Sequence, residues 1–192
     1  MSQFFGNTNK RGEIQELNDE LNSTDFKRKK IALMKVIGQM TTGKDVSLLF
    51  QSVIKCLEHP DIVLKKLVYL YIINYSKNRP DDALMVVNLF RKDIMQGTPL
   101  IRALAVRTMG CLRVQKINEY LCDLLKKALN DEDPYVKKTA IICVPKVYEV
   151  SPELIESHEI LERMQKMLPK EGNPHVLCNL ILSLFEVSQM KY

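Results

Sequence analysis

Tryptophan is absent from this sequence of 192 residues, and glycine occurs only 7 times. Proteins built from sheets and tight turns need more glycine and more aromatic residues. The longest apolar run, Leu67–Ile73, is far short of the roughly 20 residues that cross a bilayer. No CxxC pair occurs, and the cysteine count is odd: 56, 111, 122, 143 and 178. We therefore expect buried free thiols in a reducing compartment, with no disulfide framework and no zinc site.

The charge balance is mildly basic, with 28 Lys and Arg against 23 Asp and Glu, a net charge of +5. This is too weak for a dedicated nucleic-acid binder. His59, His158 and His175 are far apart in the sequence, so neither metal binding nor His-assisted catalysis is indicated. The first residues lack the charged and apolar blocks of a signal peptide. We expect a soluble, cytoplasmic, mostly helical protein, and no cofactor site is indicated.

An internal repeat organises the chain. Pro60, Pro99, Pro134 and Pro174 are each followed two residues later by Ile or Val, and they lie 39, 35 and 40 residues apart. Three of them follow Thr, Asp or Asn. Such a residue caps a helix, and proline at the first helical position loses no hydrogen bond. Each proline therefore predicts the start of a helix.

Apolar residues follow these prolines at +2, +6, +10 and +13, which is a helical stripe. In the Pro60 unit Lys66 interrupts the stripe at +6, so we expect Leu67 to replace it. A weaker copy precedes this unit, capped by Ser23 or Thr24. Further amphipathic helices are predicted between the repeats, at about Val46–Glu58, Asp81–Met95, Ile117–Asn130 and Pro152–Leu168.

Helix pairs that recur every 35–40 residues are typical of HEAT or armadillo repeats. We predict an all-α, right-handed α-solenoid. It forms one segment over residues 1–192, with a mobile tail at 1–12 and about five helix pairs over 13–192. An ordinary helical bundle does not explain the repeated cap and proline. The apolar period persists almost to Tyr192, so we expect the array to continue beyond it.

Several segments resemble the N-terminal trunk of beta-adaptins, which are large subunits of clathrin adaptor complexes. They are Lys10–Ile14, Met40–Ser47, Lys65–Tyr71, Pro99–Cys111 and Asp131–Ala140. The resemblance is strong over residues 4–150 and weakens after Val150. Pro145, inside a predicted helix, and the segment 152–170 depart from the family pattern, so contacts there are less safely inferred.

The resemblance implies a non-enzymatic scaffold that acts in vesicle-mediated protein transport, through coat assembly and cargo sorting in endocytosis or trans-Golgi and endosome traffic. The implied partners are a second large adaptin, a medium chain, a small chain and a phosphoinositide membrane. An Arf-type GTPase is a further partner, for which the Asp81–Phe90 helix is the expected surface. Clathrin would bind through a hinge that this sequence lacks. The implied location is the cytosolic face of coated vesicles.

The resemblance also assigns candidate residues. Phe4 and Phe5 match an aromatic pair that covers the cargo pocket on the small chain. A basic group matches residues that face anionic lipid, where each basic residue contributes about 1 kcal/mol; the alternative is a solvated helix face. This group consists of Lys10, Arg11, Lys27, Arg28, Lys29, Lys30 and Lys35.

A second basic group consists of Arg102, Arg107, Lys137 and Lys138. These residues could face acidic partners, but structural pairing with the carboxylates at 131–133 is the favoured interpretation.

Two other functions remain as alternatives. The segment Gly38–Asp45 approaches a phosphate-binding loop, but Asp45 occupies the position that needs Ser or Thr. We interpret it instead as a helix end at Gly43 followed by a cap at Asp45.

An importin-type peptide carrier would share the predicted fold. The absence of tryptophan counts against that carrier.

Overall fold

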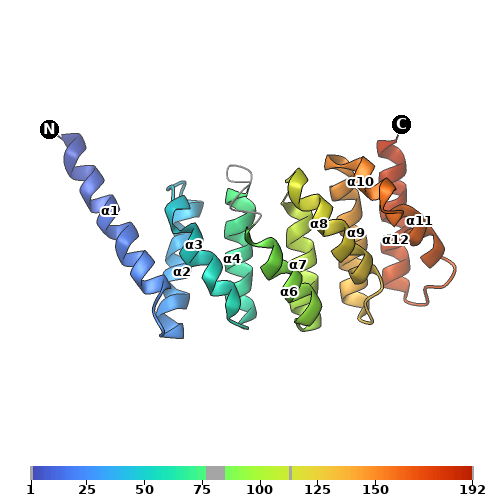
Figure 1. Ribbon diagram of the computed structural model, residues 1–192, viewed down its shortest axis with the longest axis horizontal. Coiled ribbons are helices and arrows are strands. Elements are labelled where there is room, and N and C mark those ends of the chain that lie inside the picture. The colour runs from blue at the N-terminus through green and yellow to red at the C-terminus, as the bar shows by residue number, and fades with distance from the viewer. Residues whose placement is uncertain (1, 77–84, 113, 192) are drawn as a thin grey trace. The chain divides into compact units, whose positions relative to one another are not determined.

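The computed structural model describes the backbone of residues 2–76, 85–112 and 114–191, and the side chains of these residues except 2–11, 115 and 116. Within these ranges it contains eleven α-helices and no β-strand (Figure 1). The predicted all-α fold of paired helices is confirmed. The chain divides into two compact units, Met1–Tyr75 and Ser76–Tyr192, where the sequence pattern predicted one segment.

In the N-terminal unit, α2 contacts both α1 and α4, while α1 contacts α3. These contacts place α2 and α4 in one layer and α1 and α3 in the other (Figure 1). The bounds are α1 Ser2–Leu21, α2 Phe26–Thr41, η1 Ser47–Leu49, α3 Phe50–Lys55, η2 Cys56–Glu58 and α4 Ile62–Tyr75.

In the C-terminal unit, α9 packs between α7 and α12, and α6, α8, α10 and α11 cover the same side of these three helices (Figure 1). This is the paired arrangement that the repeats predict. The bounds are α6 Val87–Gln96, α7 Pro99–Cys111, α8 Gln115–Leu129, α9 Pro134–Val150, α10 Pro152–Ser157, α11 Ile160–Met167 and α12 Pro174–Met190.

Proline and cap residues start the repeated helices as predicted at three of the four positions. Pro99, Pro134 and Pro174 lie in the first turn of α7, α9 and α12. The side chains of Asp133 and Asn173 accept hydrogen bonds from two backbone N–H groups each. The corresponding stripe residues after Pro99 and Pro134 are all buried, so the predicted core of this unit is confirmed there.

The first repeat differs from its prediction. Helix α4 begins at Ile62 and not at Pro60, and the Asp61 carboxylate accepts from the Leu64 N–H at 2.7 Å. The stripe therefore shifts by two residues, so that the predicted core position Leu70 is 46 % exposed while Leu64 is buried. Counted from the cap, Leu64 occupies the position that Val136 holds after Asp133. The cap residue therefore sets the register of the apolar stripe, and the proline does not.

The same shift applies to α2. Its cap is Asp25, which accepts from the Lys27 N–H at 2.9 Å, so the prediction of Ser23 or Thr24 is wrong. Ser23 instead accepts from the N–H of Asp25 at 3.1 Å. A hydroxyl and a carboxylate two residues apart both suit a helix start, and the carboxylate is the stronger acceptor.

Gly43 ends α2, as predicted. Its φ of 80° lies in the left-handed region, where glycine carries no penalty. The Gly43 N–H donates to Met40 O and the Lys44 N–H donates to Gln39 O, both at 3.0 Å. This pair of bonds is a Schellman motif. The residues Gly38–Thr41 are helical, which is not the geometry of a phosphate-binding loop.

Two irregular segments lie in the C-terminal unit. Helix α9 continues through the buried Pro145. The predicted helix Pro152–Leu168 is divided into α10 and α11 by Glu159, whose φ of 55° is left-handed. Of the predicted helix Asp81–Met95, residues 81–84 lie outside the described residues, and the remainder leads into α6.

Candidate functional site

The exposed face of α2 combines positive charge with apolar side chains. Lys27 and Arg28 are exposed. Arg28 forms a surface ion pair with Asp25 at 3.7 Å, in which 75 % of the arginine side chain stays exposed. Ile31 is 54 % and Met34 53 % exposed on the same helix. Residues three and four apart share a helix face. We call Lys27, Arg28, Ile31 and Met34 the α2 surface; positive charge beside apolar residues suits a membrane interface.

The other lysines of this helix are more constrained. Lys30 forms an ion pair with Asp61 at 3.5 Å, and Lys35 forms one with Glu20 at 3.1 Å. Lys29 is half-buried. The structure therefore does not expose the predicted basic group evenly. Among the members whose side chains are described, Lys27 and Arg28 are those whose charge is most available to a partner.

Four predicted site residues lie outside the described side chains: Phe4, Phe5, Lys10 and Arg11. Their backbone belongs to α1, which begins at Ser2. Residues 2–12 of the expected tail are therefore helical in backbone, and the mobility of that tail stays a prediction.

In the second basic group, Arg102 and Lys137 form ion pairs between repeats, whereas Arg107 and Lys138 form none among the described residues. The guanidinium of Arg102 donates two hydrogen bonds to the Asp131 carboxylate, at 2.8 and 2.7 Å. A third bond reaches Gly97 O at 3.0 Å. Burial would raise the pKa of Asp131, but the bonds from Arg102 and from the Asp133 N–H outweigh it and lower that pKa. The favoured interpretation, structural pairing, is confirmed for Arg102.

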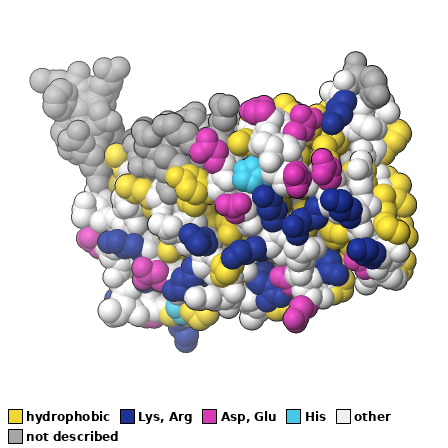
Figure 2. Space-filling model, turned by 45° about the vertical axis from the view of Figure 1, so that its right-hand side comes forward, with side chains coloured by type: hydrophobic (Ala, Val, Ile, Leu, Met, Phe, Trp, Pro, Cys, Tyr) yellow, Lys and Arg dark blue, Asp and Glu magenta, His cyan; other side chains and the backbone are white. Residues whose placement is uncertain are grey.

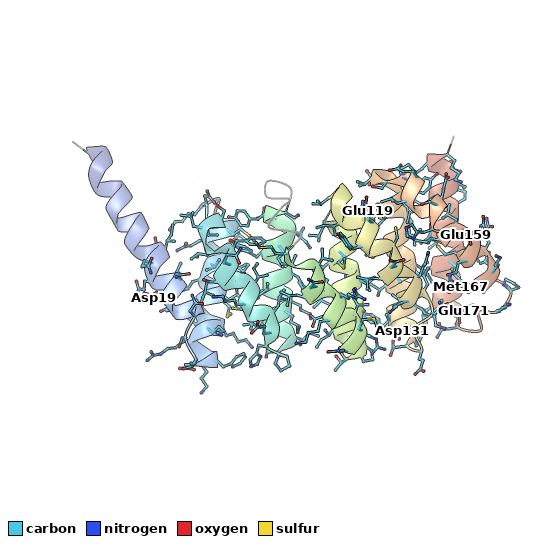
Figure 3. All side chains as sticks on the ribbon, in the orientation of Figure 1. Asp19, Glu119, Asp131, Glu159, Met167 and Glu171 are labelled. Carbon is cyan, nitrogen blue, oxygen red and sulfur yellow. The ribbon has the colours of Figure 1, made fainter. Side chains whose placement is uncertain are left out.

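Lys137 has the equivalent role one repeat later. Arg102 and Lys137 each lie four residues after a helix cap, and Asp131 and Glu171 each lie two residues before the next cap. Lys137 pairs with Glu171 at 3.4 Å. Figure 3 shows Asp131 and Glu171 at the same end of this unit. These pairs connect successive repeats, so neither cation is free to face a partner.

Arg107 and Lys138 are different. Arg107 is exposed, and the Lys138 Nζ lies 4.8 Å from the centroid of the Tyr135 ring. Together with Lys146 they line a cavity of about 270 Å³. These two residues remain candidates for contact with an acidic partner.

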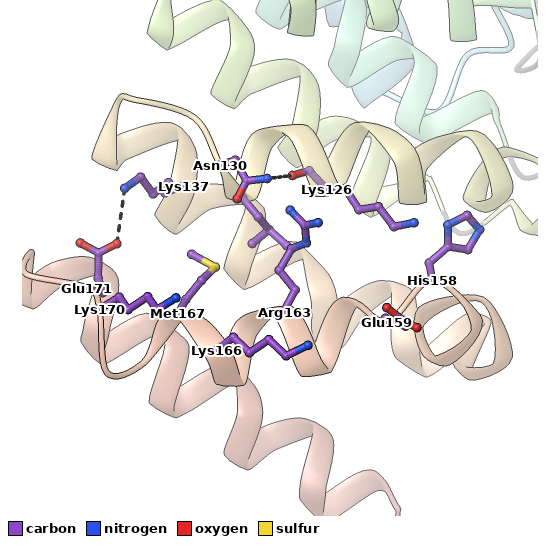
Figure 4. Close-up of a pocket in the computed structure, with 11 residues that line it drawn as sticks. Lys126, Asn130, Lys137, His158, Glu159, Arg163, Lys166, Met167, Lys170 and Glu171 are labelled. Atoms are coloured by element: carbon purple, nitrogen blue, oxygen red, sulfur yellow. Dashed lines mark hydrogen bonds and ion pairs between the residues drawn. The ribbon is translucent and has the colours of Figure 1, made fainter.

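A larger basic cavity lies in the C-terminal unit, and of its basic lining residues only Lys137 was a predicted site residue. Lys126, Arg163 and Lys166 line this space of about 550 Å³ (Figure 4). Figure 2 shows several Lys and Arg side chains close together on the C-terminal unit, with acidic side chains beside them. The spacing of Arg163 and Lys166 places them on one face of α11, a signal that was present in the sequence, whereas Lys170 lies in the turn after this helix.

The described residues contain no group of three or more His, Cys, Asp or Glu arranged to hold a metal ion. Among the same residues, no helix is both long and apolar enough to cross a membrane.

Comparison with known proteins defines the class. Paired helices of this kind characterise helical-repeat proteins, and the family model of the adaptin N terminal region matches residues 9–192. The chain belongs to this adaptin family.

The chain is similar to beta subunits of AP-1 complexes. It is 51 % identical over 189 residues to AP-1 complex subunit beta of Dictyostelium discoideum and 50 % identical over 188 residues to AP-1 complex subunit beta-1 of Homo sapiens. Each match covers 98 % of this chain and 20 % of the relative, so the chain spans about a fifth of the length of these relatives.

A homology model of the full-length AP-3 complex in an intermediate open conformation contains a chain with a TM-score of 0.61 and 18 % identity. That match covers 92 % of this chain and 34 % of the other. It supports the fold. Family membership favours the adaptor interpretation over an importin-type carrier.

Proposed function

We propose that this chain is part of a non-enzymatic scaffold subunit in a clathrin-associated adaptor complex. It would act in coat assembly and cargo sorting during endocytosis or trans-Golgi and endosome traffic, on the cytosolic face of coated vesicles. The observation that supports this most strongly is 50 % identity to human AP-1 complex subunit beta-1 over 98 % of the chain. The proposed partners are a second large adaptin, a medium chain and a small chain, with clathrin bound elsewhere in the full-length protein.

The α2 surface is proposed to contact phosphoinositide membranes. Lys27 and Arg28 supply exposed positive charge, and Ile31 and Met34 supply apolar side chains that can enter the interface. Each basic residue near an anionic bilayer contributes about 1 kcal/mol. Two such residues hold a protein weakly, so the membrane contact depends on the other subunits of the complex.

Two further contacts are proposed from the family resemblance. Phe4 and Phe5 would cover the cargo pocket of the small chain, so deletion of residues 1–9 should raise the affinity of the complex for dileucine peptides. An Arf-type GTPase would contact the segment Asp81–Phe90. Its described part offers Met85, which is 56 % exposed, whereas Phe90 is buried.

Vesicle flotation of the assembled complex tests the membrane contact. The double variant Lys27→Glu with Arg28→Glu should weaken binding to phosphoinositide vesicles by roughly thirtyfold or more. The matched control is Arg91→Glu with Lys92→Glu, an exposed pair on α6 with the same change of charge. Equal losses from both variants would show that net charge, and not the α2 surface, governs the binding.

A further inference from the structure

A concave basic site lies between α8 and α11 of the C-terminal unit, with a volume of about 550 Å³. Its acidic lining residues are Glu159 and Glu171. Its basic lining residues outnumber them: Lys126, Lys137, His158, Arg163, Lys166 and Lys170. We call this space the α8–α11 pocket.

The turn before α11 and the buried face of this helix set its orientation beside the pocket. The left-handed Glu159 ends the path of α10 and starts α11 in a new direction. One face of α11 is then fixed by Ile160 and Met164, both fully buried. The side chains of Arg163 and Lys166 extend into the pocket, where Arg163 points toward α8 (Figure 4). The core packing of α11 therefore fixes the helical part of the lining, whereas Lys170 and Glu171 lie in the turn after this helix.

The charges in the pocket are not balanced internally. Glu171 accepts from the Asn173 N–H at 2.9 Å and from Lys137 at 3.4 Å, so its carboxylate is already used. Within the described part of the chain, no hydrogen bond or ion pair is found for the side-chain nitrogens of Lys126, Arg163, Lys166 and Lys170. Like charges gathered in a concavity repel one another and raise the local concentration of anions.

The pocket has limited length. His158 lies at one end, with its Nδ1 3.7 Å from Asp123. The ion pair of Lys137 and Glu171 lies at the other end, with the remaining cations between (Figure 4). An extended acidic peptide needs a groove that is open at both ends. A bounded concavity of this volume suits a small ligand with several negative groups.

We propose that the α8–α11 pocket binds a multiply phosphorylated inositol, either as a soluble inositol polyphosphate or as a lipid headgroup. The Arg163 guanidinium can form two parallel bonds to one phosphate. Lys126 and Lys166 approach from opposite helices as point charges, which suits phosphates on different carbons of one ring. This site is separate from the α2 surface and does not depend on the proposed membrane contact there.

Calorimetric titration of the full-length chain with soluble inositol hexakisphosphate tests the proposal. The double variant Arg163→Glu with Lys166→Glu should weaken binding by roughly tenfold or more, because charge-assisted contacts are lost. The control Arg91→Glu with Lys92→Glu makes the same change of charge on α6, outside both the pocket and the α2 surface, and should retain binding. Equal losses in the two variants, or no saturable binding by the unaltered chain, would overturn the proposal.

Two further arms identify the ligand. Displacement of the Lys27→Glu, Arg28→Glu variant from phosphatidylinositol bisphosphate vesicles by inositol hexakisphosphate supports a lipid headgroup as the source. If that variant binds inositol hexakisphosphate in the calorimeter but does not bind the vesicles, the soluble ligand is supported. Tighter binding of a short polyglutamate peptide than of inositol hexakisphosphate would overturn the proposal. If the double variant loses its helical circular dichroism, the exposed single change Lys166→Glu replaces it.

Discussion

Arg102 of α7 and Asp131 before α9 form a two-bond ion pair between successive repeats, and the exposed fractions of their side chains are only 22 % and 12 %. Asp131 also accepts from the N–H of the α9 cap residue Asp133 at 2.9 Å. One carboxylate therefore fixes both the start of a helix and its distance from the preceding helix. Glu171 repeats this double role before α12.

Removal of this pair should destabilise the C-terminal unit. Arg102→Met leaves the Asp131 charge largely buried, so we expect the free energy of unfolding to fall by about 2–3 kcal/mol. Arg28→Met is the matched control, since Arg28 pairs with Asp25 at the surface and should cost less than about 0.5 kcal/mol. Urea denaturation followed by circular dichroism measures both. An equally small loss of unfolding free energy in the two variants would mean that the Arg102–Asp131 pair contributes little to the stability of the packing between repeats.

Acid should weaken the same connections. The backbone N–H of Asn173 is the main cause of the lowered pKa of Glu171, and the bonds from Arg102 keep the pKa of Asp131 low despite its burial. A carboxylate with a lowered pKa stabilises the fold above its ordinary pKa, and this contribution is lost as pH falls through the lowered value. Stability should therefore fall from about pH 4 downward. The double variant Asp131→Asn with Glu171→Gln should show a shallower dependence in unfolding curves between neutral and acid pH.

Two helical glycines should respond in opposite directions to alanine. A Cβ at Gly110 would lie 3.0 Å from both the Cβ and the Sγ of Cys143, because α7 and α9 approach closely there. Gly110→Ala should cost about 1–3 kcal/mol. Gly38 in α2 has nothing within 4 Å of its Cβ position, so Gly38→Ala should gain up to about 1 kcal/mol. Thermal melts of the two variants check the signs, and a stable Gly110→Ala would contradict the close packing.

The cysteines should differ in reactivity. Cys178 is exposed, contrary to the expectation that all five thiols are buried, and Cys111 is half-buried. Burial raises the pKa of Cys143 to about 12 and that of Cys122 to about 11, and thiolates are the reactive form. Mass spectrometry after brief alkylation of the native protein should find the label on Cys178 first. Early labelling of Cys143 would show that α9 opens readily.

The sequence predicted the repeat but misplaced one part of it. Helix-starting prolines are visible in the sequence, yet the cap residue sets the register, and at Pro60 the cap follows the proline. Counting from Asp61 restores the apolar stripe through Leu64, Val68 and Ile72, all fully buried. Lys66 interrupted the predicted stripe only because the positions were counted from Pro60 and not from Asp61.

The candidate sites were less predictable because they depend on pairing between repeats. The run at 27–30 reads as one basic cluster, but Lys30 is paired with Asp61 from the following helix pair. The α8–α11 pocket depends on the left-handed turn at Glu159, which no local pattern indicates. The spacing of Arg163 and Lys166 was visible, whereas the position of Lys126 opposite them required the fold.

The proposed function requires that the full-length protein is a subunit of an assembled adaptor complex. Affinity purification of the full-length protein from cytosol, with mass spectrometric identification of its partners, tests this most directly. A second large adaptin, a medium chain and a small chain should co-purify in equal amounts. Recovery of a transport receptor or a soluble cargo protein, with no adaptin subunit, would contradict the proposed function.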